Sequence, residues 1–162
     1  LIIPKMSQRI NKIKKKKWDS NFKNKNVEKN KNVILKDKQN SKFIWPVKGK
    51  LLSKYGKSRE GFYNDGINID SKKGTKVISS QAGKVIYCGN EIPGYGNLIL
   101  IKHSKNWITA YAHLNEVFTE KGKNVNKGEI IGSVGNTGNV RSPQLHFEIR
   151  KGKESVNPLN LL

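Results

Sequence analysis

Cysteine and histidine are scarce in this 162-residue sequence, which has one cysteine, Cys88, and three histidines. A single cysteine cannot form an internal disulfide, and these numbers are too low for the paired ligands of a zinc finger. Long apolar runs are also missing, because no stretch approaches the roughly 18 consecutive apolar residues of a membrane-spanning helix. The composition therefore excludes an integral membrane protein of the helical type and a zinc-finger framework.

Acidic residues are few, and glycine is unevenly distributed. The sequence has 12 Asp and Glu against 32 Lys and Arg, a formal net charge of +20, which favours a partner that carries negative charge. All 15 glycines follow residue 42, whereas residues 1–42 hold 14 basic and three acidic side chains, a net charge of +11 that leaves +9 for the rest. We interpret residues 1–42 as a basic, disordered tail and residues 43–162 as the folded domain.

The composition of the tail favours an electrostatic contact over a packed interface. Its lysines and asparagines offer too few apolar side chains to support a core, so we expect either attachment to an anionic polymer or lipid face, or plain compositional drift. Nucleic-acid binding is disfavoured because only Trp18 and Phe22 offer aromatic rings near these charges. No signal peptide is readable after Leu1, because polar and basic residues follow within a few positions.

Short β-branched and aromatic runs separated by glycine and asparagine dominate the sequence after Phe43. Such runs predict strands, and no segment has the sustained 3.6-residue apolar period of a helix. We therefore predict an antiparallel all-β domain of about 120 residues. The clearest predicted strands are residues 84–87, 97–101, 107–111 and 129–131.

Polar side chains occupy one face of two further extended segments. Alternate residues of a strand point to the same face, so Gln144, His146 and Glu148 share a face while their neighbours pack inward. Asn64 and Asn68 also share a face if their segment is extended. His113 is a third polar candidate, within Tyr-Ala-His-Leu.

Several motifs in register over residues 43–161 resemble the lysostaphin/LytM family of peptidoglycan endopeptidases. Within that family the sequence resembles most closely the NlpD-type cell-division lipoproteins, whose LytM domain activates an amidase and does not cut peptidoglycan itself. The resemblance implies an antiparallel LytM-like β domain. The motifs are Phe-Ile-Trp-Pro-Val-Lys-Gly at 43–49, Gly-Ile-Asn-Ile at 66–69, Gly-Tyr-Gly-Asn at 94–97, Tyr-Ala-His-Leu at 111–114, Val-Asn-Lys-Gly at 125–128 and Leu-His-Phe-Glu-Ile-Arg at 145–150.

The resemblance also indicates where the family's zinc site would lie. The family binds zinc through a His-x-x-x-Asp motif and the second histidine of His-x-His, while the histidine of Tyr-x-His and the first of His-x-His serve the chemistry. In this sequence Asn64 and Asn68 stand at the first two zinc positions, and only His146 remains at the third. Of the two chemical positions, His113 remains and Gln144 replaces the other histidine.

These substitutions argue against a working zinc centre. Carboxamides are weak, neutral ligands, so Asn64 and Asn68 leave His146 as the sole strong donor where catalytic zinc needs three. Gln144 cannot accept and return a proton near neutral pH. We expect no cofactor. Neither Asp65, predicted on the opposite face, nor Asp70, two residues beyond the ligand position, is expected to rebuild the site.

The sequence thus predicts a non-catalytic LytM-like domain at the bacterial cell wall, in the periplasm or cell envelope. Its expected partners are peptidoglycan and, by resemblance, an N-acetylmuramyl-L-alanine amidase that it activates during daughter-cell separation; the tail would contact an anionic envelope polymer or lipid. One alternative is a zinc-dependent peptidoglycan endopeptidase with unusual ligands, and another is a protein that binds the envelope or nucleic acid through its tail. The candidate groove residues are Tyr55, Tyr63, Tyr95, His113 and His146, although packing alone also accounts for the two histidines.

Overall fold

The computed structural model describes residues 43–162, and the predicted tail lies outside these described residues. Within this range the chain forms twelve strands and two short 3-10 turns, and no helix is long and apolar enough to cross a bilayer. The prediction of an antiparallel all-β domain is confirmed. The elements are β1 (Lys50–Ser53), β2 (Gly56–Lys57), β3 (Tyr63–Asn64), β4 (Ile67–Asp70), β5 (Lys76–Ile78), β6 (Gly83–Gly89), β7 (Asn97–Lys102), η1 (Ser104–Asn106), β8 (Trp107–Val117), β9 (Asn124–Val125), β10 (Ile130–Val134), β11 (Gln144–Lys151), β12 (Glu154–Val156) and η2 (Pro158–Asn160).

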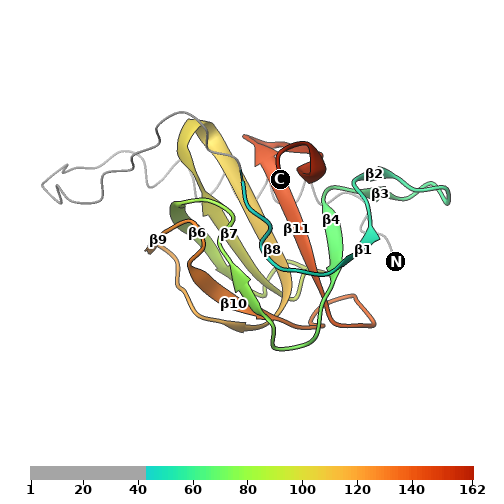
Figure 1. Ribbon diagram of the computed structural model, residues 1–162, viewed down its shortest axis with the longest axis horizontal. Helices are drawn as coiled ribbons and strands as arrows, with labels where there is room; N and C mark the ends of the chain where they lie inside the picture. Colours follow the sequence, from blue (N-terminus) through green and yellow to red (C-terminus); the bar gives the residue numbers. More distant parts are fainter. Residues whose placement is uncertain (1–42) are drawn as a thin grey trace, which may run out of the picture.

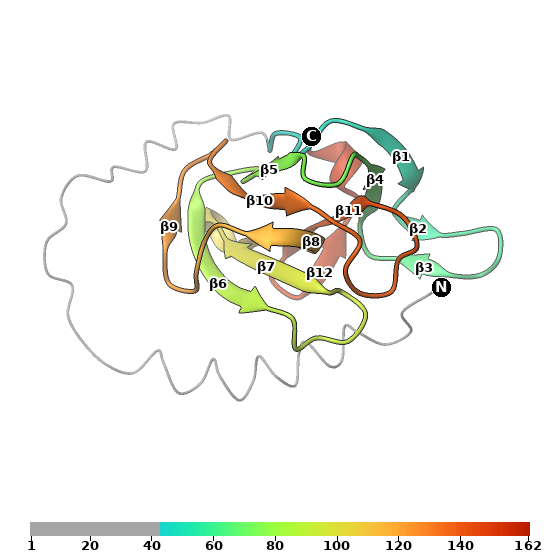
Figure 2. The same cartoon turned by 90° about the horizontal axis from the view of Figure 1, so that it is seen from below.

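One large antiparallel sheet forms the body of the domain (Figures 1 and 2). Its strand order is β1-β4-β11-β8-β7-β6-β9, with β10 pairing to β5 and β8, and β12 pairing to β11. The long strands β8 and β11 lie at its centre and pair from His146 opposite Ala112 to Lys151 opposite Trp107. The four predicted strands match β6, β7, β8 and β10, although β8 continues to Val117.

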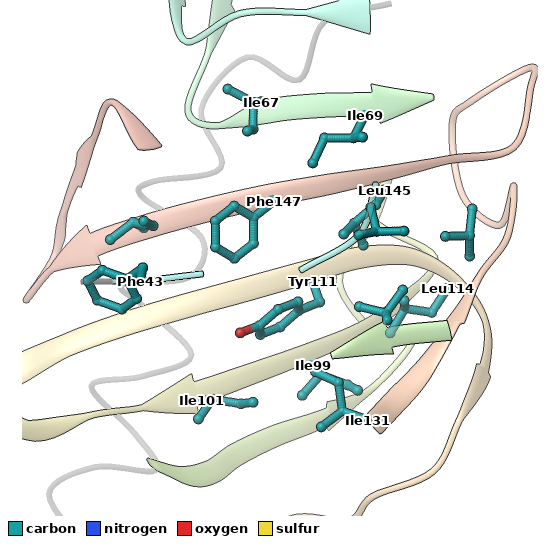
Figure 3. Packing of buried hydrophobic residues seen from close by; sticks show 14 of the residues in the cluster. Phe43, Ile67, Ile69, Ile99, Ile101, Tyr111, Leu114, Ile131, Leu145 and Phe147 are labelled. Carbon is teal, nitrogen blue, oxygen red and sulfur yellow. The ribbon is translucent and has the colours of Figure 1, made fainter. Parts of the chain in front are cut away.

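One face of this sheet packs the main hydrophobic core. Leu145, Phe147 and Ile149 alternate along β11 and are fully buried, as the sequence predicted. Tyr111 from β8 lies beside Phe147, with ring centroids 5.4 Å apart, and Figure 3 shows both among isoleucines of β4 and β7. Each fully buried side chain of this size stabilises the fold by about 1.5–3 kcal/mol. The apolar face of β11 is therefore held against the core, and its polar face points to the other side of the sheet.

The opposite side of β11 carries its polar residues. His146, Glu148 and Arg150 lie beside Ala112, Ala110 and Ile108 of β8, in that register, and all six are buried. Alanines next to His146 and Glu148 leave room for larger polar groups. A second, smaller apolar cluster covers this side of the sheet and consists of Ile92, Tyr95, Leu98, Leu100, Ala110 and Ala112.

The segment from Asn64 to Ile69 is not one continuous strand. β3 ends at Asn64, the chain bends at Asp65 and Gly66, and β4 begins at Ile67. A Cβ atom at position 66 would lie 2.2 Å from the carbonyl oxygen of Phe147, so only glycine allows this close approach to β11. The bend brings Asn64 back over β4 and sets the position of the candidate site.

Candidate functional site

A groove of about 610 Å³ lies over the polar ends of β4 and β11. It brings together Asn64, Asn68, Gln144, His146 and His113, the five positions that the resemblance singled out. The remaining lining residues come from the segments around β2 and β3 and from two loops, and they are Ser53, Lys54, Gly56, Ser58, Glu60, Phe62, Tyr63, Asp65, Gly94, Tyr95, Asn139, Val140 and Arg141.

The floor of the groove begins with two linked asparagine carboxamides. The backbone N–H of Gly66 donates to Asn64 Oδ1 at 3.1 Å, which leaves Asn64 Nδ2 as a donor. This Nδ2 donates to Asn68 Oδ1 at 3.0 Å and to Ser53 Oγ at 2.9 Å. The bend at Gly66 therefore brings the two asparagines together, although the strand is interrupted between them.

The same series of hydrogen bonds continues from β4 to β11. Asn68 Nδ2 donates to Gln144 Oε1 at 2.9 Å, and Gln144 Nε2 donates to the carbonyl oxygen of Ser142 at 3.1 Å. We call Asn64, Asn68 and Gln144 the amide chain. A backbone donor at one end and a backbone acceptor at the other fix the direction of every hydrogen bond in it.

His146 lies beside the amide chain and is held by protein groups at both ring nitrogens. Its Nδ1 lies 3.1 Å from Asn68 Oδ1, and its Nε2 lies 2.9 Å from Glu148 Oε1. The ring also packs edge-to-face against Tyr95 at 5.7 Å. The imidazole is therefore locked in one orientation, with neither nitrogen directed freely into the groove.

The buried carboxylate of Glu148 holds the His146 ring in place. It accepts hydrogen bonds from Tyr95 Oη at 2.9 Å and from Arg150 Nε at 2.6 Å, and it also contacts His146 Nε2. Burial by itself raises the pKa of Glu148, but the hydrogen bond from His146 and the charge of Arg150 outweigh it and lower the pKa to about 2. Burial and the Glu148 charge raise the pKa of Tyr95, so its hydroxyl remains a donor.

Neither aspartate near the site completes a metal centre. Asp65 Oδ1 accepts a hydrogen bond from Ser155 Oγ at 3.0 Å, and its Oδ2 lies 3.5 Å from Arg150 Nη2. Asp70 is exposed and lies opposite Lys50 and Gln144 in the sheet. Across residues 43–162, no three His, Cys, Asp or Glu side chains gather in a group that could hold a metal ion.

The donor set at the family's zinc position does not fit a zinc ion. Asn64, Asn68 and His146 occupy that position, and their side chains hydrogen-bond to one another, to Gln144 and to Glu148. A neutral amide offers zinc a weak oxygen ligand, and binding would also cost each amide its present hydrogen bonds. Nothing in the arrangement supplies an anionic ligand at Asn68.

His113 sits across the groove with an unusual backbone. Its φ is +62°, a conformation that non-glycine residues seldom adopt, and its N–H donates to the carbonyl oxygen of Tyr95 at 2.8 Å. Its Nδ1 lies 2.8 Å from the carbonyl oxygen of Thr137 and must donate to it. Burial, helped by the nearby His146 ring, lowers the pKa of His113 to about 4, so the ring is neutral at pH 7.

The predicted aromatic residues have different positions. Tyr63 and Tyr95 line the groove, but Tyr95 is buried and its hydroxyl already donates a hydrogen bond to Glu148. Tyr55 does not line it: its ring packs edge-to-face behind Tyr63 at 5.7 Å and its hydroxyl donates to the Ser155 carbonyl oxygen at 2.9 Å. Its hydrogen bond with Tyr55, together with burial, raises the pKa of Tyr63 to about 12.

Sequence reasoning did not assign several residues that shape the groove. Phe62 and Tyr63 are 42% and 53% exposed and place two aromatic rings at the rim, of which Phe62 was not among the predicted groove residues. Arg141, on the loop before β11, also lines the groove. Glu148 was placed on the correct face, but its central role was missed because the alternation of a strand gives direction and not partners.

Comparison with known proteins matches this chain to the model of peptidase family M23 over residues 62–158. The chain is 48% identical over 122 residues to the cell division protein DipM of Caulobacter vibrioides, which covers 74% of this chain and 20% of DipM. It is 43% identical over 122 residues to the murein hydrolase activator NlpD of Escherichia coli, covering 75% of this chain and 31% of NlpD. The chain thus spans less than a third of either relative.

A solved structure shows the same fold. The catalytic domain of the antimicrobial peptidase lysostaphin from Staphylococcus simulans superposes with a TM-score of 0.65 and 26% sequence identity, over 69% of this chain and 90% of that domain. The resemblance seen in the sequence is confirmed by both kinds of comparison. This chain belongs to peptidase family M23, with the LytM-type fold and NlpD-like relatives.

Proposed function

We propose that this chain is a non-catalytic member of family M23 that acts at the bacterial cell wall by binding. The amide chain is the observation that carries this proposal, because it places three neutral carboxamides where the family's chemistry needs imidazole and carboxylate. Without those groups the site has no means to generate a metal-bound hydroxide or to move a proton at Gln144. No cofactor is required for the function proposed.

The binding partner we propose is a peptidoglycan amidase, which this domain activates during cell division. NlpD is named as a murein hydrolase activator and DipM as a cell division protein, which supports such a role in the cell envelope. The family resemblance further suggests an N-acetylmuramyl-L-alanine amidase. Peptidoglycan itself is the second expected ligand.

The groove has the features of a binding site even without chemistry. The exposed rings of Phe62 and Tyr63 offer apolar contact area at the rim, while Lys54 and Arg141 provide donors for carboxylates. His146 is fixed by Glu148, so the floor is rigid and little entropy is lost when a ligand binds. These features favour recognition of a partner segment or a peptidoglycan fragment.

One experiment separates this proposal from the metalloendopeptidase alternative. The purified chain is analysed for zinc, and peptidoglycan release is measured with the chain alone, with the host's N-acetylmuramyl-L-alanine amidase alone, and with both together. We expect no stoichiometric zinc and release that rises only when both proteins are present. Stoichiometric zinc with chelator-sensitive cleavage by the chain alone would refute the proposal.

A further inference from the structure

The end of the sheet away from the groove carries a concentration of lysines. Lys84 of β6 lies directly opposite Lys102 of β7, which in turn lies opposite Ile108 of β8. Ile108 pairs with Arg150 of β11, four residues beyond His146, or about 13 Å along the strand. Lys84 and Lys102 are therefore neighbours across the sheet, in a row of paired residues that lies well away from the groove.

Two turns extend this row. The backbone N–H of Gly152, between β11 and β12, donates to the carbonyl oxygen of Asn106, in the turn that precedes β8, at 2.9 Å. Lys151 Nζ donates to the Lys105 carbonyl oxygen and lies 4.6 Å from the centre of the Trp107 ring. We call the set Lys84, Lys102, Lys105, Lys151 and Lys153 the basic end; all but the half-buried Lys102 are exposed.

The basic end has little opposing charge of its own. Glu154, in register with Lys151, is the one carboxylate that these strand ends and turns carry within the described part of the chain. The carboxylates of Glu148 and Asp65 lie beside Arg150, whose guanidinium they offset. A positive field therefore extends outward from this end of the sheet.

The chain enters the fold at this same end. The Phe43 ring packs edge-to-face against His103 at 5.7 Å and against Trp107 at 5.8 Å. Figure 1 shows the first described residues, the β7–β8 turn and the end of β11 together at the upper end of the sheet. Phe43, which 14 basic residues precede in the sequence, therefore lies next to the basic end.

We propose that the basic end binds the surface of an anionic lipid bilayer and orients the groove away from it. Its lysines come from separate strands and turns and form a broad end, whereas a single polymer strand is usually held in a groove. Trp107, half-buried beneath Lys151, adds the kind of aromatic ring that is favoured at a bilayer interface. The proposal concerns a different surface from the groove and does not depend on the proposed function.

Vesicle binding of the full chain tests the proposal. Binding is measured by co-sedimentation with phosphatidylcholine vesicles with and without phosphatidylglycerol, for the wild type and for Lys84→Gln/Lys105→Gln/Lys153→Gln. The matched control is Lys72→Gln/Lys73→Gln/Lys76→Gln, which removes the same charge from exposed positions around the start of β5. We expect phosphatidylglycerol-dependent binding that falls with salt, and a loss of about fivefold per lysine in the first variant only.

Equal losses in the two variants, or no binding to the phosphatidylglycerol vesicles, would overturn the proposal. Binding to soluble polyphosphate or duplex DNA but not to vesicles would also overturn it, in favour of a polymer site. Amide hydrogen exchange on vesicles gives a second readout that does not depend on the variants. We expect protection at residues 103–107 and 151–154 and none at residues 56–63, and the reverse pattern would contradict the proposed orientation.

Discussion

The Asn68 Oδ1 atom lies 3.1 Å from His146 Nδ1, so a carboxamide oxygen meets the imidazole at the point where the family would place a metal. Asn64 Nδ2 donates to the same oxygen. Asn68 of β4 therefore lies between Asn64 of β3, from which it accepts, and His146 of β11. This arrangement suggests that restoring the ligands, with the backbone unchanged, is the most direct test of the site.

The triple variant Asn64→His/Asn68→Asp/Gln144→His is expected to bind about one zinc ion per chain. It restores two imidazoles and a carboxylate around His146, on strands whose register already brings these positions together. Elemental analysis after dialysis measures the metal, with Asn64→Ala/Asn68→Ala/Gln144→Ala as the control. A folded triple variant that retains no zinc would show that the groove no longer keeps the family's geometry.

Glu148→Gln is expected to destabilise the domain by about 3 kcal/mol. The change removes the carboxylate from the buried Arg150 and weakens the hydrogen bonds of His146 and Tyr95 at the same time. Urea unfolding measures the loss, and Glu154→Gln, which is exposed, is expected to change stability by no more than about 0.5 kcal/mol. Similar small effects for both variants would contradict the central role given to Glu148.

The neutral, buried ring of His113 is expected to make stability depend on pH. Its pKa is lowered from 6.5 to about 4 in the folded chain, so the unfolded chain binds more protons between these values. This contribution is complete above about pH 6.5 and is lost as the pH falls toward 4, by about 2–3 kcal/mol. Unfolding at pH 7, 5.5 and 4.5 measures it.

His113→Asn is the matched control for that pH series, because asparagine tolerates the positive φ of this position and does not titrate. We expect the stability of the variant to fall less steeply than that of the wild type between pH 6.5 and 4.5. Parallel curves for the two proteins would assign the pH dependence to other groups.

The aromatic rim is expected to contribute to partner activation. Phe62→Ala/Tyr63→Ala removes the two exposed rings of the groove and should lower amidase activation about tenfold, since buried aromatic anchors commonly dominate binding. Leu52→Ala removes a similarly exposed apolar side chain that does not line the groove. Equal activation by both variants would indicate that the partner binds elsewhere.

The strands were predictable where their signal is local. β6, β7 and β11 combine alternating or continuous apolar residues with clear turns, so the predicted ranges lie within the observed ones. β9 and β12 were missed because strands of two or three residues are defined by their partners and not by their composition. The bend at Gly66 was missed for a similar reason: the clash that requires glycine comes from Phe147, far away in the sequence.

In the candidate site, too, the positions of residues along the chain were predictable, but their tertiary contacts were not. The positions of Asn64, Asn68, Gln144 and His146 were predicted from the resemblance, and the structure brings them together. Tyr55, a predicted groove residue, is not among the lining side chains, and its hydroxyl turns toward Ser155, one hundred residues later in the chain. Side-chain partners across such separations are set by tertiary packing, which a strand pattern does not contain.

The hydrogen bond from Gln144 to the Ser142 carbonyl oxygen joins the loop before β11 to the floor of the groove. A ligand that hydrogen-bonds to the Gln144 carboxamide would compete with its bonds to Ser142 and Asn68, and Asn68 in turn accepts from Asn64. Such a ligand must exchange existing hydrogen bonds for its own, so its affinity depends on how closely its polar groups match the carboxamide pattern.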